Sequence, residues 1–398
     1  MAACLALCLL LAGCAESQAG TGSSTQHAGQ QTEKDSTASS GAETKDPGSE
    51  AAADTAETED TADTEAAAKT AETEDTTKTA ETKDTVDTAE TAETAVAAET
   101  KDAADADASQ APVVYFTYDI SAERLGRIYE ALGWTPEGNV AVKISTGEPP
   151  ASNYLRPELI GDLVKKVDGT IVECNTAYGG SRSSSAMHKQ VAEDHGFTAI
   201  ADFDLMDEEG EVEWPMSGGT RLDKVIVGSH AENYSDWMIL SHFKGHAMAG
   251  FGGAIKNVGI GISSPSGKVY VHTAGTETSG SIWYSDQDAW LEALAEMVSG
   301  FSSHVGKEHI IYINVMNRLS VDCDCDGHPA EPDIHDIGIL AGTDPVALDQ
   351  ACVDLIYQAE GNESLVERME SLHAIHTLEH AEEIGLGSRT YELVSIDD

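Results

Sequence analysis

The chain is poor in positive charge, and this shortage limits its partners. Its 398 residues include 23 Lys and Arg against 70 Asp and Glu, a formal net charge of −47. A protein that binds nucleic acid in general needs a basic surface to neutralise phosphates, so the composition excludes that class. The first fourteen residues carry no charge, but they are too few to span a bilayer as a helix, which takes about 20 residues.

Aromatic residues are absent from the first 111 positions, and all of them lie in residues 112–398. Residues 15–111 also lack an apolar stripe at the spacing of a strand or a helix, and they repeat acidic phrases such as TAETEDT at 55–61 and 70–76. Without apolar surface to bury, nothing offsets the entropy cost of ordering. We expect residues 15–111 to be a disordered acidic tether and residues 112–398 to be the folded part.

Residues 1–14 read MAACLALCLLLAGC, a short apolar stretch that ends in small residues before a cysteine. This pattern is typical of an export signal. The last four letters, LAGC, resemble the lipobox of bacterial lipoproteins, in which the cysteine thiol is lipidated and the preceding peptide is removed. The Lys or Arg that usually precedes the apolar run is missing. We expect an exported protein that a lipid on Cys14 anchors to the membrane, on the cell surface or the periplasmic side.

Short apolar strands alternate with helical patterns from Pro112 onward. We expect strands at 113–118, 139–145, 170–174, 224–228, 237–241, 309–315 and 337–341, and helices at 121–132, 185–195, 286–299 and 344–359, with one more opening at Arg156-Pro157. This alternation predicts an α/β domain with a mixed or mainly parallel sheet and flanking helices. In such sheets the ligand site lies in loops beyond the strand ends.

Glycines and cations gather in residues 241–268, SHFKGHAMAGFGGAIKNVGIGISSPSGK. Glycines let backbone amides approach a ligand closely, and Gly252 and Gly253 are the candidates for this. Polar candidates in the same segment are His242, Lys244, His246, Lys256 and Asn257. An anion or a metal ion would find partners here. The alternative is a glycine-rich crossover that packs tightly under a helix, since the spacing fits neither a Walker loop nor a dinucleotide fingerprint.

A second cluster, DCDCDGHP at 322–329, can be interpreted in three ways. In the first, Cys323, Cys325 and His328 are soft ligands for zinc or iron. A Cys-x-Cys pair supplies only two of the usual four ligands, so a distant residue must complete the set. The candidates for this residue are His242, His246 and Cys174.

The other two interpretations of this cluster need no soft metal. Asp322, Asp324, Asp326, Gly327 and Asp333 nearly match the calcium loop D-x-D-x-D-G-x5-E, but an Asp replaces the final Glu and the flanks have the pattern of strands. Calcium is therefore less favoured than zinc or iron. The last interpretation is an acidic turn whose thiols are free or, after export, joined in a small disulfide ring.

Three histidines, His373, His376 and His380, share one face of a helix expected near the C-terminus. The phrase HTLEH at 376–380 fits the H-x-x-E-H pattern of inverted zinc peptidases. Only 18 residues follow it, which leaves little room for the further acidic ligand of such enzymes, so a packed helix is favoured. Cys352 recurs at helical spacing with apolar residues, which predicts a place in the core.

Four phrases together resemble the domain-of-unknown-function family 362. They are SHFKGH (241–246), GGAIKNVGIG (252–261), DCDCDGHP (322–329) and DIGILAGTDPVALDQACVDLI (336–356). The family has no established reaction, and many of its members carry a ferredoxin insert with a C-x-x-C-x-x-C run after the glycine-rich segment. This sequence has no cysteine between Lys268 and the second cluster, which argues against an iron–sulfur cluster here.

Two hypotheses of different classes follow. In one, the domain is an enzyme with redox character: Cys323 and Cys325 with His242 or His246 hold a metal, while Lys244 and Lys256 orient a small anionic substrate. In the other, a non-catalytic protein uses the same residues to capture a metal or a small anion. Both hypotheses require the two clusters to meet in one cleft.

Overall fold

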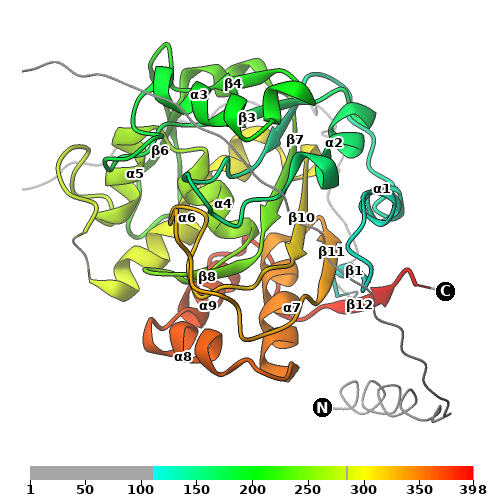
Figure 1. Cartoon of the computed structure of the whole chain (residues 1–398). Coiled ribbons are helices and arrows are strands. Elements are labelled where there is room, and N and C mark those ends of the chain that lie inside the picture. The colour runs from blue at the N-terminus through cyan, green and yellow to red at the C-terminus, as the bar shows by residue number, and fades with distance from the viewer. Residues whose placement is uncertain (1–110, 284–285, 398) are drawn as a thin grey trace, which may run out of the picture. The chain divides into compact units, whose positions relative to one another are not determined.

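An eight-stranded sheet is the centre of the part that the computed structural model describes, residues 111–283 and 286–397 (Figure 1). Its order is β12-β1-β11-β10-β7-β2-β3-β4. The strands are β1 (Val113–Thr117), β2 (Val140–Lys143), β3 (Thr170–Glu173), β4 (Phe203–Leu205), β7 (Asp236–His242), β10 (Ile310–Met316), β11 (Gly338–Gly342) and β12 (Glu392–Ser395). Strand β11 runs antiparallel to both neighbours and the other pairs are parallel, which confirms the mixed, mainly parallel sheet. The expected signal with Cys14 and nearly all of the expected tether, residues 15–110, lie outside the described residues.

Helices cover both faces of this sheet (Figure 1). Helices α1 (Ala122–Ala131) and α2 (Pro157–Lys166) pack on one face, where their Leu and Ile side chains meet Val140 and Val142 of β2. Helices α4 (Ala254–Gly261), α6 (Gln287–Val305) and α7 (Pro345–Gln358) pack on the other face, which includes Ala141 of the same strand. Successive residues of a strand point to opposite faces, so β2 serves both cores.

The helices begin where the sequence places their caps. Ser121 accepts a hydrogen bond from the backbone NH of Arg124 at the start of α1, and Asp286 accepts one from Ala289 at the start of α6. Asp344 accepts two, from Val346 and Ala347, at the start of α7. Each side chain satisfies amides that the first turn of a helix leaves without a partner.

Two of the predicted elements differ in the structure. Strand β6 (Lys224–Gly228) pairs with β5 (Glu211–Pro215) in a separate hairpin rather than in the main sheet. Helix α6 continues beyond residue 299 to Val305, because apolar residues such as Phe301 keep one face of this last part buried. The remaining helices are α3 (Ser185–Asp194), α5 (Pro265–His272), α8 (Glu363–Ser371) and α9 (Ile375–Glu383). Of the helices described, none is both long and apolar enough to cross a bilayer.

The chain leaves β2 and β7 toward opposite faces. After β2 it passes through α2 to β3, the neighbour on one side, and after β7 it passes through α4, α5 and α6 to β10, on the other side. Strands β2 and β7 are adjacent and parallel, so their carboxyl ends form a topological switch point. In open α/β sheets a crevice opens at such a point, and ligands bind there.

Candidate functional site

A cavity of about 140 Å³ lies at this switch point. Lys143 ends β2, Glu173 ends β3, and the segment after β7 contributes Lys244 and His246 to the lining. Cys323, Asp324 and Cys325 line it as well. The structure thus brings the glycine-rich segment and the Cys-x-Cys cluster into one cavity, as the sequence predicted.

Positive charge dominates the lining of this cavity. Its charged residues are five cations, Lys143, Arg182, Lys244, Lys256 and Lys268, and two carboxylates, Glu173 and Asp324. The surrounding chain has a net charge of −47, so this excess runs against the composition. A cleft lined by one sign of charge focuses the field and attracts ions of the opposite sign.

Lys143 and Glu173 form a buried ion pair in the lining of the cavity. The Nζ of Lys143 lies 2.9 Å from Oε2 of Glu173 and 3.0 Å from Oδ1 of Asn257, and it also donates to the carbonyl of Ile144. Burial by itself would raise the pKa of Glu173, but Lys143 and other nearby cations lower it to about 2. All three donors of the lysine are thus engaged within the protein.

A second buried network joins Lys244, Asp324 and His242. The Nζ of Lys244 lies 3.1 Å from Oδ2 of Asp324 and donates to the carbonyl of His242 at 2.6 Å. The two ring nitrogens of His242 lie 2.7 Å from Oδ1 of Asp324 and 2.6 Å from the carbonyl oxygen of Asn317. Burial opposes ionisation of Asp324, yet His242 and Lys244 hold its pKa well below the usual range. Since both His242 nitrogens face acceptor oxygens, neither offers a lone pair to a metal, and the predicted ligand role of His242 is wrong.

Lys256 belongs to neither of these two networks. It lies on α4, is half-buried, and has no hydrogen-bond or ion-pair partner for its Nζ among residues 111–283 and 286–397. Burial, with repulsion from Lys244, Lys143, Arg182 and Lys268, lowers the pKa of Lys256 to about 7. Near neutral pH this amine is therefore partly uncharged, which is unusual for a lysine.

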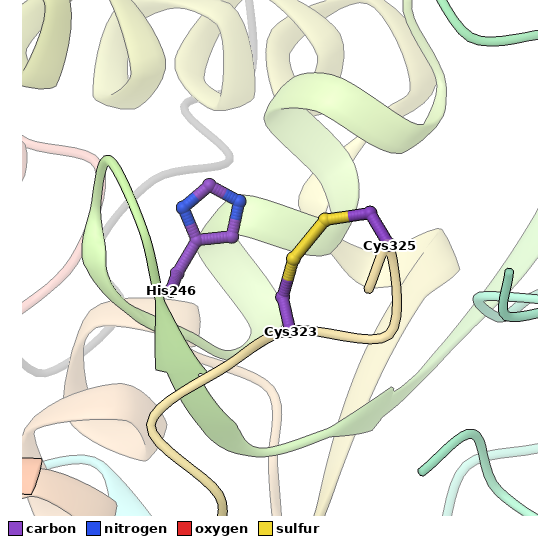
Figure 2. A group of neighbouring side chains, drawn as sticks. All are labelled: His246, Cys323 and Cys325. Carbon is purple, nitrogen blue, oxygen red and sulfur yellow. A yellow bond between two sulfur atoms is a disulfide. The ribbon is translucent and has the colours of Figure 1, made fainter. Parts of the chain in front are cut away.

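His246 lies beside the two sulfur atoms of the second cluster (Figure 2). Cys323 and Cys325 are joined by a disulfide, and a ring nitrogen of His246 and the two Sγ atoms lie within 4.8 Å of one another. The three side chains form a group that could bind a metal. A thiolate, and not a disulfide sulfur, is the metal ligand, so the disulfide must first be reduced.

The tautomer of His246 follows from its backbone contacts. Its Nδ1 accepts hydrogen bonds from the NH groups of Met248 at 3.1 Å and Ala249 at 3.0 Å. Burial, with repulsion from Lys256 and Lys244, holds its pKa well below the ordinary value for histidine, so the ring is neutral and Nε2 carries the proton. A metal-binding histidine usually donates from its second nitrogen, whereas this one accepts there. In this state His246 offers the cavity a donor.

Two other predicted ligands lie outside this group. His328 is exposed and does not line the cavity, so its predicted place beside the cysteines is wrong. Cys174 lines the cavity but is not part of the His246 group; its thiol donates to the carbonyl of Ile262, and burial raises its pKa to about 12. Cys352 is fully buried in the core, as predicted.

The calcium interpretation is also wrong. Asp324 is paired with His242 and Lys244, and Asp322 accepts from the backbone NH of Ala330 at 3.0 Å. Asp326 is exposed and accepts from the NH of His328. In the described part of the chain these carboxylates form no group that could hold an ion.

Several glycines of the segment serve packing rather than ligand approach. A Cβ on Gly253 would lie 2.4 Å from Oδ1 of Asp349, which accepts hydrogen bonds from the NH groups of Ala254 and Ile255 at the start of α4. The first two amides of α4 are therefore capped by a buried carboxylate, while Gly253 itself lines the cavity. Gly252 lines the cavity with only Lys244 near its Cβ position, at 3.6 Å.

Asn257 lines the cavity, but its side chain is hydrogen-bonded to other residues of the protein. Its side-chain amide donates to the carbonyl of Lys143 at 3.2 Å and to Oγ of Ser241 at 3.0 Å, while its oxygen accepts from Lys143. It ties α4 to the ends of β2 and β7. The predicted role in orienting a ligand is therefore not supported by this geometry.

The C-terminal histidines pack two helices together and do not hold zinc. His373, just before α9, and His376 and His380 on it lie 3.1, 3.0 and 3.2 Å from carboxylates on α6. Their partners are Asp288, Glu292 and Glu296. Glu379, which would activate water in a peptidase, pairs with Arg389. The packed-helix interpretation agrees with this geometry.

Sequence reasoning missed several residues of the cavity. Lys143 and Glu173 had a signal, because each places a charge at the end of an apolar strand. Arg182, in a Gly/Ser-rich loop, had none. His272 ends α5 and stacks on Trp290 with 5.0 Å between ring centroids. Its buried Nδ1 has no hydrogen-bond partner within the described ranges, and burial lowers its pKa to about 3.

Fold and site together define a three-layer α/β protein with a cation-lined cavity at the switch point of its sheet. The sequence profile of the family described as Domain of unknown function (DUF362) matches residues 140–354, more than half of the chain, and the chain belongs to this family. No match is found among curated proteins.

Two solved structures are distantly similar to this chain. One is the lactate racemase apoprotein from Thermoanaerobacterium thermosaccharolyticum, with 13% identity and a TM-score of 0.37, covering 62% of this chain and 57% of that one. The other is a structural-genomics protein from Thermotoga maritima, with 12% identity and a TM-score of 0.35, covering 66% of this chain and 58% of that one. The match thus spans less than two thirds of either relative.

Proposed function

We propose that the folded domain binds a small anionic molecule in the cavity at the switch point. The observation that carries this proposal is the excess of cations in the lining. Three of the five have a carboxylate partner: Lys143 pairs with Glu173, Lys244 with Asp324 and Arg182 with Glu148. Lys256 and Lys268 have no carboxylate partner among the described residues.

A bound anion would relieve this imbalance. Uncompensated positive charges inside a protein repel one another more strongly than in water, because the interior has a low effective dielectric constant. The neutral His246 adds an Nε2–H donor. Small carboxylates and phosphates have the charge and the acceptor atoms that such a lining recognises.

Calorimetric titration of the full chain with oxalate and with inorganic phosphate tests this proposal. We expect at least one of the two to bind, and Lys256→Gln to weaken that binding roughly tenfold or more, equal to about 1.4 kcal/mol or more. Lys189→Gln is the matched control, because Lys189 is an exposed lysine paired with Glu208. Failure of both anions to bind, or equal losses in the two variants, would reject the anion site.

The second candidate function is a soft-metal or redox centre at Cys323, Cys325 and His246, favoured by their position within 4.8 Å of one another. Reduction adds two electrons and two protons to the disulfide, and the resulting thiols can lose protons to a metal such as zinc or iron. His246 would have to release Nδ1 from the two backbone amides, or lose the proton on Nε2.

Elemental analysis separates this candidate from the first. The chain is purified without an affinity-tag metal, incubated with zinc with and without reductant, and compared with Cys323→Ser/Cys325→Ser. Zinc retained by the reduced wild type alone would support the centre. Equal and negligible zinc in all samples would reject the metal centre and would not count against the anion site.

We also propose that the protein is exported and anchored by a lipid on Cys14. The LAGC phrase carries this proposal. Expression with a radiolabelled fatty acid should label the wild-type protein and place it in the membrane fraction. Cys14→Ser should lose both properties, while Cys8→Ser, upstream of the expected cleavage site, should keep them. Labelling of Cys14→Ser at the wild-type level would contradict the anchor.

A further inference from the structure

We propose that Lys256 is a nucleophile that forms an imine with the carbonyl carbon of a small 2-oxo acid bound in the cavity. This inference rests on the proposed anion site and gives it a substrate class. It adds a covalent step and requires no metal.

The first argument is the freedom of the Lys256 amine. Four lysines line the cavity, and three of them have acceptors for Nζ: Lys143 has three, Lys244 has the His242 carbonyl and Asp324, and Lys268 has the Ser263 carbonyl. Lys256 has no such acceptor within the described ranges. A lysine whose Nζ donates to acceptors as an ammonium group has no free lone pair for attack. Lys256 has no such acceptors, so its nitrogen can turn toward a ligand.

The second argument is the charge around that amine. The groups that act on Lys256 are cations, from Lys244 and Lys143 to Arg182 and Lys268, and the two histidines His246 and His272 are neutral at physiological pH. The acids of the lining, Glu173 and Asp324, are already paired with Lys143 and Lys244. Burial and these cations lower the pKa of Lys256 to about 7, so a large fraction is the uncharged amine that can attack a carbonyl.

The third argument is the pairing of this nucleophile with an anion site. The carboxylate of a 2-oxo acid is directly bonded to its carbonyl carbon. Lys268 and the Nε2–H of His246 line the same cavity as Lys256, so they are suited to hold that carboxylate while the carbonyl meets the amine. Binding in this way would replace a bimolecular encounter by reaction within a complex.

The step is balanced without any other reagent. The nitrogen lone pair of Lys256 attacks the carbonyl carbon, the C–N bond forms, and the carbonyl oxygen takes up a proton to give a carbinolamine. The C–O bond then breaks. Both hydrogens of the amine leave with the oxygen as water, and the product is a C=N double bond between Lys256 and the ligand.

Reductive trapping tests the imine. The full chain is incubated at pH 7 with glyoxylate and cyanoborohydride, which reduces an imine to a stable amine, and peptide mass spectrometry measures the rate at each lysine. We expect Lys256 to react at least roughly tenfold faster than the exposed Lys189, because its lowered pKa of about 7 leaves a large fraction of the amine uncharged at pH 7. With glycolaldehyde, an aldehyde that lacks the carboxylate, the ratio of the labelling rates at Lys256 and Lys189 should be smaller.

Two comparisons keep failure of the imine distinct from failure of the anion site. Lys256→Arg retains the positive charge but cannot form an imine and should show no fast-reacting site, while calorimetric titration of the wild type with oxalate reports on the anion site. Oxalate should slow the labelling of wild-type Lys256 and leave Lys189 unchanged. If oxalate binds while Lys256 reacts no faster than Lys189, the imine is rejected and the anion site stands. If oxalate and phosphate do not bind and Lys256 is also slow, both proposals fail.

Discussion

The Nδ1 of His242 lies 2.7 Å from Oδ1 of Asp324, and both side chains are almost completely buried. Asp324 is the residue between the two cysteines, and His242 is the last residue of β7. This contact therefore fixes the Cys-x-Cys turn to the end of the central strand. The backbone of Asp324 also accepts from the NH of Glu148 at 2.7 Å, which joins the loop after β2 to the same turn.

Asp324→Asn should destabilise the fold by about 3–5 kcal/mol, because it leaves buried cations without their counter-charge. Urea unfolding measures this, with the exposed Asp326→Asn as control and an expected change within about 0.5 kcal/mol. The folded pKa of Asp324 lies below its unfolded value, so its contribution is present above about pH 4 and is lost as the pH falls through the folded pKa. A stability difference between wild type and Asp324→Asn that increased as the pH fell would contradict this pairing.

The cysteines of the folded part should differ in reactivity. Cys174 and Cys352 are buried and burial raises the pKa of both thiols, so alkylation of the native chain should leave them unmodified. Cys325 is partly exposed and should be alkylated only after reduction of its bond to Cys323. Peptide mapping before and after mild reductant measures this. Modification of Cys325 without reductant would show that the disulfide is not formed.

Lys256→Met should stabilise the protein, since it removes a positive charge from a cluster of like charges. The folded pKa of Lys256, about 7, lies below the unfolded value of about 10.4. Protonated Lys256 therefore destabilises the folded state below pH 7, and this destabilisation decreases as the pH rises from 7 to 10. We expect a gain of about 2–4 kcal/mol at pH 6, reduced by the partial exposure of the side chain, and a smaller gain at pH 10.

Denaturant unfolding at several pH values measures this gain, with Lys189→Met as the matched surface control. A gain in stability combined with loss of anion binding is typical of a residue kept for function. Destabilisation by Lys256→Met, or a gain that does not change with pH, would show that the cation cluster carries no strain.

Asp349→Asn should destabilise the protein by about 1–3 kcal/mol, because the amide cannot accept from both Ala254 and Ile255 and also from Asn314. Burial raises the pKa of Asp349 to about 6, above its unfolded value, so its contribution is largest below about pH 4 and is lost as the pH rises through 6. The difference in stability between wild type and Asp349→Asn, measured by thermal unfolding, should decrease as the pH rises from about 4 to 6. A difference that widens with pH would contradict the assignment.

The strands and helices that were predicted lie close to their expected positions, because their signals are local. The cap at Ser121, the prolines at 157 and 345, and the apolar runs of β7 and β10 each act within a few residues. The hairpin of β5 and β6 was not predicted, because a strand pattern does not specify its partner. Partners are chosen by contacts between distant segments.

The candidate site could be predicted in part. The sequence identified His246, Lys244, Lys256 and the two cysteines because cations and thiols stand out in an acidic chain, and the structure places all five around one cavity. It could not separate His246 from His242, which have the same chemistry four residues apart. One ring faces the sulfurs and the other is enclosed by acceptor oxygens.

The sequence by itself determined the class of fold, the family, the excess of acid and the two clusters, since composition and periodicity are properties of the chain before it folds. Only the tertiary structure decided which charges cancel. Glu173 neutralises Lys143 and Asp324 neutralises Lys244, while no carboxylate reaches Lys256 within the described residues. Ion pairing depends on distances of a few ångströms between residues that lie tens of positions apart, and folding alone sets those distances.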